Sequence, residues 1–437
     1  MLIGILMLIL FLITAVLMVS RKLPTIIALP ILAVGVAGIA GVPLMDSSAG
    51  KDMGILNQVI QGGATRLATA CCAVLLGAWL GQFMNQVGIS KAIVKGAAEL
   101  GGDNPFFVTV LVTIAVAMLF TTIEGLGSII MVATIAVPIM ISVGVPGITA
   151  GCMMLFAIAT GGIINMSNWA FYTAATGVAQ SDVQTFALTL AVLTAGVSLL
   201  FAIIEFKRTG IKFTWAAHAP IKSSLPTFAE KTPILSVFTP VIPILAVTIF
   251  KWPILPAFLI GLVWCFFTIY LFSAKRNFNQ LTSVLTKAAL EGVSDSAPAV
   301  MLMIGIGMVL NSFMHPIVAK NITPFLQAVI PSERLTYILF FSLLAPLALY
   351  RGPLNLWGLG SGIATVMIGL KILPAPAVFS AFLSAERVQC IGDPTNTHNV
   401  WLSNYIGADV NQILIKVLPY IWGLAISGII ISGFIWF

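Results

Sequence analysis

Two polar interruptions inside long apolar runs constrain this chain more than any other feature. The first, Gly161 to Asn168, lies inside the apolar run Ile148 to Val178, which is long enough to cross a bilayer. The second, Ile391 to Asn399, lies inside the run Pro374 to Tyr405. Unpaired backbone groups are costly in hydrocarbon, so such breaks persist at membrane depth only where they line a cavity or are buried in protein. A matched pair of interrupted segments is typical of a transporter binding site.

The composition indicates a membrane protein. Hydrophobic residues make up 59% and charged residues 8% of the 437 positions, whereas a soluble globular chain carries about 25% charged residues. The first apolar run, Leu2 to Val19, has no basic segment before it, so it predicts a span rather than a cleavable signal peptide. The five cysteines lie within apolar runs and support neither disulfides nor a metal site: Cys71, Cys72, Cys152, Cys265 and Cys390.

Apolar runs of about 20 residues predict the spanning helices. Two further apolar stretches, 105–143 and 335–371, are interrupted near the middle by Thr121 to Ser128 and by Tyr350 to Asn355. Each half of such a stretch is too short to cross alone, so we interpret both as re-entrant helical hairpins. The alternative is two straight spans, each with a charge at its centre. About ten spans are predicted, at 2–20, 23–42, 64–86, 148–178, 183–205, 233–250, 254–273, 289–312, 374–405 and 411–436.

The loop charges fit this topology. The net charge of +7 is concentrated in loops that fall on one side of the membrane when the N-terminus is placed outside. Cytoplasmic loops carry an excess of Lys and Arg, so that side is assigned to the cytoplasm, and nucleic-acid binding is not expected. The chain is thus predicted to be a multi-pass integral membrane protein, in the cytoplasmic (inner) membrane if bacterial, with both termini extracytoplasmic.

The order of elements repeats. Each half has two spans, a span entered through a polar segment, a short amphipathic piece, a hairpin, a broken span and a closing span. The odd number of crossings in the first half inverts the second. The predicted fold is therefore an all-α polytopic membrane protein of two inverted repeats, 1–206 and 233–437, joined by a cytoplasmic linker at 207–232. The binding site is expected where the repeats meet, near the midplane.

This doubled layout, a polar hairpin tip followed by an apolar helix and a broken span, resembles the ion transporter superfamily. That superfamily includes the dicarboxylate/sodium symporters, the gluconate permeases and the membrane subunits of TRAP transporters. The tip Glu124 to Gly127 looks most like that of the gluconate permeases, whereas the Ser-Asn-Thr tip of the dicarboxylate symporters is absent. The resemblance implies an elevator-type motion and a homodimer formed through scaffold spans. It also implies a scaffold part, 1–100 and 233–332, and a transport part, 101–206 and 333–437.

Four helix ends form the predicted substrate site. The second arm of each hairpin and the second half of each broken span are expected to begin near the midplane, at about Ser128, Asn168, Asn355 and Asn399. A helix N-terminus carries roughly +0.5 charge and free N–H groups, so four converging ends favour an anion. The side chains there either cap the helices or contact ligand, and both roles stay open. The substrate-binding candidates are Gly127, Ser128, Ser167, Asn168, Asn355, Thr397, His398 and Asn399.

Arg351 is the strongest single candidate for substrate contact. An Arg inside the membrane costs at least about 2.5–3.5 kcal/mol and indicates a functional site. Its guanidinium can hold a carboxylate by two hydrogen bonds. The alternative is an internal ion pair with Glu124 at the opposite tip. His398 is a second titratable candidate, either as a proton relay or as a satisfied hydrogen-bonding residue.

Glu124 and Asp393 are the candidates for coupling. A carboxylate beside an anion site repels the substrate unless it is protonated, paired or bound to a cation. Either acid could therefore carry a proton or ligate Na⁺, or could be a static partner of Arg351 or Arg387. The remaining residues assigned to cation or proton coupling are Asn165, Thr395 and Asn396.

Other polar and aromatic residues are predicted to be structural. Glu386 and Arg387 are expected to have separate partners, because adjacent positions on a helix do not face each other. Arg66 and Asp295 open matching spans and are predicted to be caps or interfacial anchors. The two tryptophans that follow the interruptions closely are expected to pack, with a wall of the cavity as the alternative: Trp169 and Trp357.

These features predict a secondary active transporter of a small organic anion, expected to be a carboxylate, coupled to Na⁺ or H⁺. The sequence has no nucleotide-binding loop, haem motif, zinc spacing or nucleophile–base pair, so neither a one-chain ATP-driven pump nor an enzyme is expected. No cofactor other than Na⁺ is expected. The expected partners are the anionic substrate, membrane lipid and a second copy of the chain. The alternatives are a cation/proton antiporter, in which Glu124 and Asp393 form the primary site, and a channel.

Overall fold

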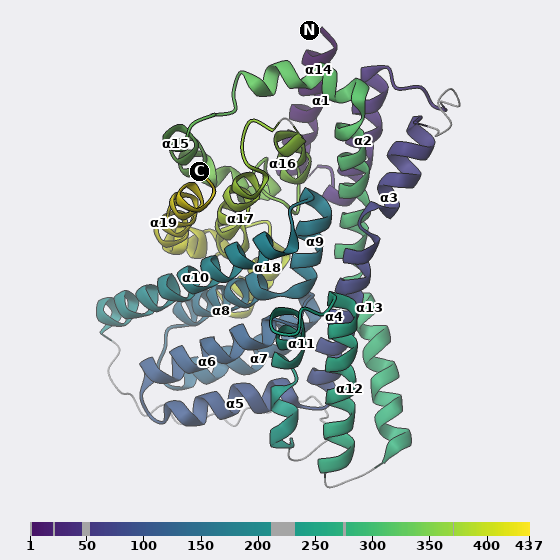
Figure 1. Ribbon diagram of the computed structural model, residues 1–437. Helices are drawn as coiled ribbons and strands as arrows, with labels where there is room; N and C mark the ends of the chain where they lie inside the picture. Colours follow the sequence, from purple (N-terminus) through teal and green to yellow (C-terminus); the bar gives the residue numbers. More distant parts are fainter. Residues whose placement is uncertain (1, 21, 46–52, 211–231, 274–276, 370) are drawn as a thin grey trace.

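The computed structural model describes residues 2–20, 22–45, 53–210, 232–273, 277–369 and 371–437. These residues form helices joined by turns and loops, with no β-strand among them (Figure 1). Most of the predicted linker 207–232 lies outside the described residues. Seven described helical segments are long and apolar enough to cross a membrane, fewer than the ten predicted: Ile55–Gln86, Gly147–Ile164, Gln180–Thr209, Ile254–Phe272, Phe278–Met314, Arg334–Arg351 and Val410–Trp436.

One group of helices packs around α13 (Phe278–Met314), and we call it the α13 group. The 37 residues of α13 extend about 55 Å at the usual helical rise of about 1.5 Å per residue. Helices α2 (Thr25–Ala40), α3 (Gly62–Arg66) and α4 (Ala68–Gln86) pack along it. In Figure 1, α4, α12 and α13 stand upright beside one another. The other members are α1 (Leu2–Val19), a π-helix (Ile55–Gln61), a 3-10 helix (Ile234–Phe238), α11 (Val241–Thr248), α12 (Ile254–Phe272) and α14 (Pro316–Gln327).

The second group packs around α17 (Ala375–Gly392) and α19 (Val410–Trp436), and we call it the α17 group. In Figure 1, α5, α6, α8 and α10 run across the view, with α15, α16 and α17 above them. The assignment of the two groups to a scaffold part and a transport part stays a prediction. The other members are α5 (Ile89–Gly101), α6 (Pro105–Phe120), α7 (Leu126–Ser142), α8 (Gly147–Ile164), α9 (Met166–Thr176), α10 (Gln180–Thr209), α15 (Arg334–Leu344), a 3-10 helix (Ala345–Arg351), α16 (Gly360–Gly369) and α18 (Thr397–Tyr405).

Both predicted interruptions are breaks between helices. Helix α8 ends at Ile164 and α9 begins at Met166, and between them Asn165 has extended backbone angles. Helix α17 likewise ends at Gly392, and four residues separate it from the start of α18 at Thr397. The first hairpin stretch forms α6 and α7, which pack on each other and are joined by a tip where Gly125 has a φ of +88°. Such an angle favours glycine, which has no Cβ to clash. The inverted relation of the two halves stays a prediction.

Two stretches differ from the simplest expectation. In 335–371, the arms on either side of the tip pack mainly on different helices: α15 lies against α19, and α16 lies against α13 and α17.

The expected span 233–250 is not one continuous helix, because Pro233 and Pro240 each start a new short helix. Proline lacks the N–H that would continue a preceding helix. The eight residues of α11 extend about 12 Å, too little to cross the roughly 30 Å hydrocarbon core alone.

Helix α4 presents small residues to the α17 group. Ser167 Oγ on α9 donates a hydrogen bond to Ala73 O at 3.1 Å. Gly77 and Gly81 follow Ala73 at i+4 spacing, which places all three on one face of α4. A Cβ on Gly77 would lie 2.9 Å from Ser167 Oγ, and one on Gly81 would lie 3.2 Å from Ile123 Cγ2. The small residues therefore let α9 and the first hairpin tip lie directly against α4.

Filling this face should destabilise the fold. Gly77→Val is expected to lower the free energy of unfolding by about 1–3 kcal/mol, because overpacking forces neighbouring groups apart. Gly196→Val is the control, since no neighbouring atom lies within 4 Å of a Cβ at that position in α10. Thermal unfolding of the purified variants in detergent measures the difference. Equal unfolding midpoints for the two variants would contradict the tight contact between α4 and α9.

Candidate functional site

The first break is fixed to the first hairpin tip by one side chain. Asn165 Oδ1 accepts a hydrogen bond from the N–H of Ser167 at 2.9 Å and so caps α9. Asn165 Nδ2 donates to Phe120 O at 3.1 Å and more weakly to Ile123 O at 3.4 Å. The amide therefore satisfies backbone groups on both segments. Asn165, predicted to serve coupling, thus has a structural role in this conformation.

Two predicted substrate residues next to this break already have protein partners. Ser167 Oγ bonds to α4, as described above. Asn168 Nδ2 donates to Gly162 O at 2.8 Å and spans the break. The predicted packing of Trp169 is confirmed, because its side chain is fully buried and its Nε1 donates to Ile163 O at 2.8 Å.

The first hairpin tip contains two buried polar atoms without partners. Glu124 Oε1 and Ser128 Oγ each lack a hydrogen-bonding partner among the described residues. Ser128 is fully buried and lies in the first turn of α7, which begins two residues earlier at Leu126. Leaving such a group unpaired costs about 1–3 kcal/mol. These two atoms therefore have unused hydrogen-bonding capacity near the start of α7.

The second hairpin tip is a compact loop. Helix α16 begins at Gly360, not near Asn355 as expected, because Asn355 O accepts N–H bonds from Gly358 and Gly360 at 3.0 Å each. Asn355 Oδ1 accepts from the N–H of Trp357 at 2.8 Å, while its fully buried Nδ2 has no described partner. The two oxygens of Asn355 thus hold the backbone of the tip, and its Nδ2 remains an unpaired donor.

Arg351 lies at this tip and does not pair with Glu124 among the described contacts. Its backbone N–H donates to Asp393 Oδ2 at 3.4 Å, and its Nη1 donates to Trp357 O at 3.4 Å. The φ of Arg351 is +55°, which is unusual for a residue with a side chain. Asp393 Oδ1 accepts from both the N–H and the Oγ1 of Thr395 at 2.7 Å. Asp393 is therefore paired within its own loop.

The second break ends in an organised start of α18. Thr397 is the first residue of α18, and Asn396 precedes it with extended backbone angles. His398 Nε2 lies 3.2 Å from both Cys390 O and Asn396 Nδ2, which makes His398 a satisfied hydrogen-bonding residue here. Asn399 Nδ2 donates to Ile391 O at 3.2 Å and to the backbone O of Asp393 at 3.0 Å. Its Oδ1 is a further buried atom without a described partner.

The two tips and two breaks touch in a ring. Asn165 joins the first tip to the first break, as above. The ring of Trp357 stacks on that of Phe171 in α9, with centroids 4.0 Å apart, and so joins the second tip to the first break. The contact of Arg351 with Asp393 joins the second tip to the second break. Helix α18, which follows the second break, packs against α7, which follows the first tip. We call these four connected segments the ring, and four of the buried atoms without described partners lie on three of them: Glu124 Oε1, Ser128 Oγ, Asn355 Nδ2 and Asn399 Oδ1.

A buried ion pair beside this ring corrects one prediction in part. Arg387 Nη2 donates to Glu386 Oε1 at 3.0 Å, so these neighbours pair with each other, which the prediction did not include. Each also has a separate partner on another helix, as predicted. Tyr172 OH donates to the same carboxylate at 3.2 Å, and Arg387 Nη1 donates to Ala159 O at 3.2 Å. Sequence reasoning missed the role of Tyr172, whose hydroxyl is one of several in α9 and gives no local signal of an acidic partner. The pair joins α17 to α8 and α9 and lies next to Phe171.

Asp295 differs from one of the two predicted roles, because it lies inside α13 and does not cap that helix, whereas an interfacial position of Arg66 and Asp295 stays a prediction. Arg66 Nη1 donates to Asn311 Oδ1 at 3.0 Å, and its buried Nε has no described partner. Asp295 lies in the interior of α13 and accepts from Gln82 Nε2 at 2.5 Å. A Cβ on Gly127 would lie 2.7 Å from Asp295 Cγ. Gly127, a predicted substrate residue, is thus covered by a carboxylate of the α13 group.

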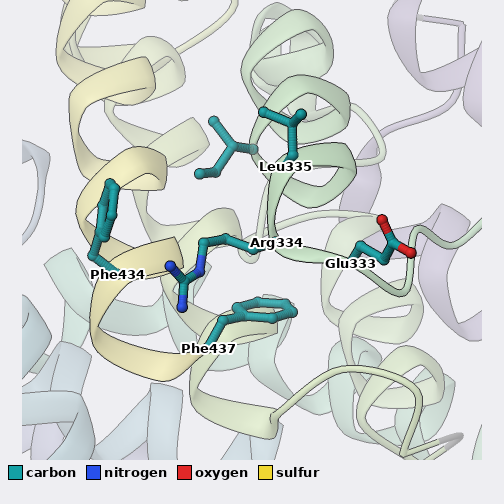
Figure 2. A pocket seen from close by; sticks show the side chains of 6 residues that line it. Glu333, Arg334, Leu335, Phe434 and Phe437 are labelled. Atoms are coloured by element: carbon teal, nitrogen blue, oxygen red, sulfur yellow. The ribbon is translucent and has the colours of Figure 1, made fainter.

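One surface pocket lies away from the ring. It is lined by residues at the start of α15 and the end of α19, and Figure 2 shows Arg334 between the rings of Phe434 and Phe437. The guanidinium carbon is 5.4 Å from the centroid of Phe434, within cation–π range. Glu333 beside it points away from that contact (Figure 2). None of the unpaired buried atoms lines this pocket.

The buried ion pair should be sensitive to loss of one partner. Arg387→Met is expected to lower the free energy of unfolding by about 3–5 kcal/mol, because Glu386 is left as an uncompensated buried charge. The double variant Glu386→Gln with Arg387→Met should recover much of this loss. Chemical denaturation in detergent measures both. Lys287→Met, which breaks an exposed pair with Glu291, should cost at most about 1 kcal/mol. A double variant no more stable than Arg387→Met would contradict the pairing.

Two solved structures share this arrangement of helices. The YdaH transporter of Alcanivorax borkumensis matches with a TM-score of 0.65 and 14% sequence identity, covering 94% of this chain and 97% of that chain. MtrF of Neisseria gonorrhoeae, described within a class of antimetabolite efflux pumps, matches with a TM-score of 0.61 and 13% identity, covering 96% of this chain and 94% of that chain. No protein-family model and no curated protein sequence matches the chain.

These likenesses establish the fold. Each spans nearly the whole chain, so the overall arrangement of helices is shared with both structures. Together with the seven long apolar segments, they support an integral membrane protein. The membership of the superfamily that the sequence resembles stays a prediction. The chain has the fold of a membrane transporter.

Proposed function

We propose that this protein is a secondary active transporter of a small organic anion, a carboxylate, coupled to Na⁺ or H⁺. The observation that carries the proposal is the set of unpaired buried atoms on three of the four segments of the ring. Two of these atoms can donate a hydrogen bond, Ser128 Oγ and Asn355 Nδ2, and the guanidinium of Arg351 lies at the same tip as Asn355. Amide and guanidinium N–H groups donate and never accept, so they suit a carboxylate.

The energetics favour a ligand over an empty, closed site. Each unpaired buried group costs about 1–3 kcal/mol, and a carboxylate that accepts from several of them recovers that cost on binding. Hydrogen bonds to a charged group are stronger than neutral ones, contributing about 1.5–3 kcal/mol each. The N-terminus of α7 adds a favourable partial positive charge beside Ser128. A neutral solute of the same size would gain less from each of these contacts.

The unpaired acceptors suit the coupling cation. Glu124 Oε1 and Asn399 Oδ1 lack described partners, whereas both oxygens of Asp393 already accept hydrogen bonds. This difference favours Glu124 over Asp393 as the group that binds H⁺ or Na⁺. Hard cations prefer oxygen ligands. No cluster of three or more His, Cys, Asp or Glu in the described part could hold a metal, so Na⁺ at Glu124 would also need amide, hydroxyl or backbone oxygens.

The packing between the two helix groups supports a proposal for the motion of the transporter. The α17 group carries all four tips and breaks, and it meets α4 of the α13 group through small residues. We propose that the α17 group slides along this face in an elevator-type movement and that the α13 group forms the homodimer contact. We further propose that both termini are extracytoplasmic, as the loop charges indicate.

A cation/proton antiporter is the second candidate, and the unpaired carboxylate oxygen of Glu124 is the observation that favours it. In that case Glu124 is the primary site and Arg351 is a structural counter-charge. The antiporter needs no organic solute. Binding experiments with carboxylates therefore separate the two candidates.

Arg351 should be required for anion binding. The purified protein is screened by thermal shift against carboxylates, sugar acids and simple cations, with and without Na⁺, at two pH values, because a ligand of the native state raises its stability. Arg351→Ala is expected to weaken the active carboxylate by about tenfold or more, the loss of one charged hydrogen bond. Arg334→Ala, which changes an exposed Arg outside the ring, should bind normally. Unchanged affinity in Arg351→Ala would overturn the assignment.

Glu124 should couple the cation to the anion. Glu124→Gln keeps the shape of the side chain and removes its charge and its titration. We expect this variant to bind the carboxylate with an affinity that no longer depends on Na⁺ or on pH. The same titrations measure this. A wild type stabilised by cations alone, with no carboxylate effect, would favour the antiporter, and a variant that keeps the full cation dependence would exclude Glu124 as the coupling residue.

A further inference from the structure

A carboxylate from the α13 group lies against the first hairpin tip. Asp295 on α13 accepts a hydrogen bond from Gln82 Nε2 on α4 at 2.5 Å. The same carboxylate occupies the space that a side chain at Gly127 on α7 would fill, since a Cβ there would lie 2.7 Å from Asp295 Cγ. A Cβ on Gly125 would also lie 3.1 Å from Asp295 Cβ. Three helices from both packing groups therefore meet at one carboxylate.

This carboxylate faces the end of a helix that attracts anions. Gly127 is in the first turn of α7, and the first backbone bond of that helix is donated by Ile129 to Gly125 O. The N–H groups of Leu126 to Ser128 precede that bond and have no partner within the helix. The helix dipole adds a partial positive charge. Asp295 thus supplies the negative charge that a bound carboxylate would supply at the same place.

The unpaired hydroxyl of Ser128 adjoins this contact. Ser128 follows Gly127 directly, and its fully buried Oγ has no described partner. Asp295 therefore covers the helix end without satisfying the polar side chain beside it. An anion that bound the whole first turn would satisfy Ser128 as well.

The hydrogen bond of Asp295 allows it to separate from the tip without losing its partner. Its hydrogen-bond partner Gln82 belongs to the same packing group, so Asp295 remains paired when α7 moves away. One turn earlier on α13, Glu291 accepts from Gln86 Nε2 at 2.5 Å and pairs with Lys287 at 3.6 Å. That second acid repeats the glutamine–carboxylate arrangement at a more exposed position. It provides a matched control within the same seam.

We propose that Asp295 determines access to the anion site: Asp295 and the carboxylate of the substrate occupy the N-terminal end of α7 alternately. The inference rests on the proposed function, since it requires an anionic substrate. In the conformation seen here the tip is docked on Asp295, and the helix end is closed to the substrate. When the α17 group moves away from α13, the helix end is released, and the substrate replaces Asp295 there.

The first test removes the competing charge. The probe is the carboxylate that gives the largest thermal shift with the wild-type protein, titrated against wild type, Asp295→Asn and Glu291→Gln. Asp295→Asn is expected to bind the probe about two- to fivefold more tightly, the size of one charge at a helix terminus. Glu291→Gln should match the wild type. Equal or weaker binding by Asp295→Asn would overturn the proposal and leave Asp295 as a structural cap.

The second test locks the contact. Gly127→Cys and Asp295→Cys are introduced together into a chain whose five native cysteines are replaced by alanine. A Cβ–Cβ separation of about 3.5–4.5 Å suits a disulfide, and the side chains meet at this point. Oxidation should abolish the thermal shift by the probe, and reduction should restore it. Oxidised, cross-linked protein that still binds the probe would overturn the proposal. A wild type that responds to no carboxylate contradicts the proposed function itself, and the inference falls with it.

Discussion

The structure depends on the hydrogen bonds that satisfy backbone groups where helices are interrupted inside an apolar protein. Both broken spans expose N–H and C=O groups that lipid cannot satisfy. Asn165 and Asn168 pair backbone groups on both sides of the first break, and Asn399 pairs two carbonyls on the α17 side of the second. Because Asn165 also bonds to the end of α6, pairing at the break holds the first hairpin tip in place. The hydrogen bonds that satisfy the broken backbone thus also hold the polar segments together. A few buried atoms on these segments keep no described partner.

The unpaired buried atoms on the tips and breaks are of two kinds, hydrogen-bond donors and hydrogen-bond acceptors. The donors Ser128 and Asn355 lie on the two hairpin tips, whereas the acceptors Glu124 and Asn399 lie on the first tip and at the start of α18. On the proposed function, the donors would bind the anion and the acceptors the cation. Asp295 adds a carboxylate from the other packing group and covers one anion-attracting helix end. We therefore propose a site whose occupancy depends on the relative position of the two helix groups.

Sequence reasoning located the breaks and tips because glycine, asparagine and charged residues are conspicuous inside apolar runs. It could not place the start of α16, which a loop organised by Asn355 delays to Gly360. The pairing of Glu386 with Arg387 was also beyond it. Adjacent side chains on an exposed helix point apart, but two buried opposite charges gain from pairing, and long side chains can bend to meet while each keeps a partner on another helix. The contact of Asp295 with Gly127 depends on tertiary packing and has no local signal.

The most direct measurement is a high-resolution structure of the purified protein in a lipid nanodisc with a saturating carboxylate. The account predicts bound density within hydrogen-bonding distance of Asn355 Nδ2, Ser128 Oγ and the guanidinium of Arg351. It also predicts that Asp295 no longer lies against Gly127 in that state. Density at another place, such as the pocket beside Arg334, with the ring atoms paired to protein instead, would contradict the account.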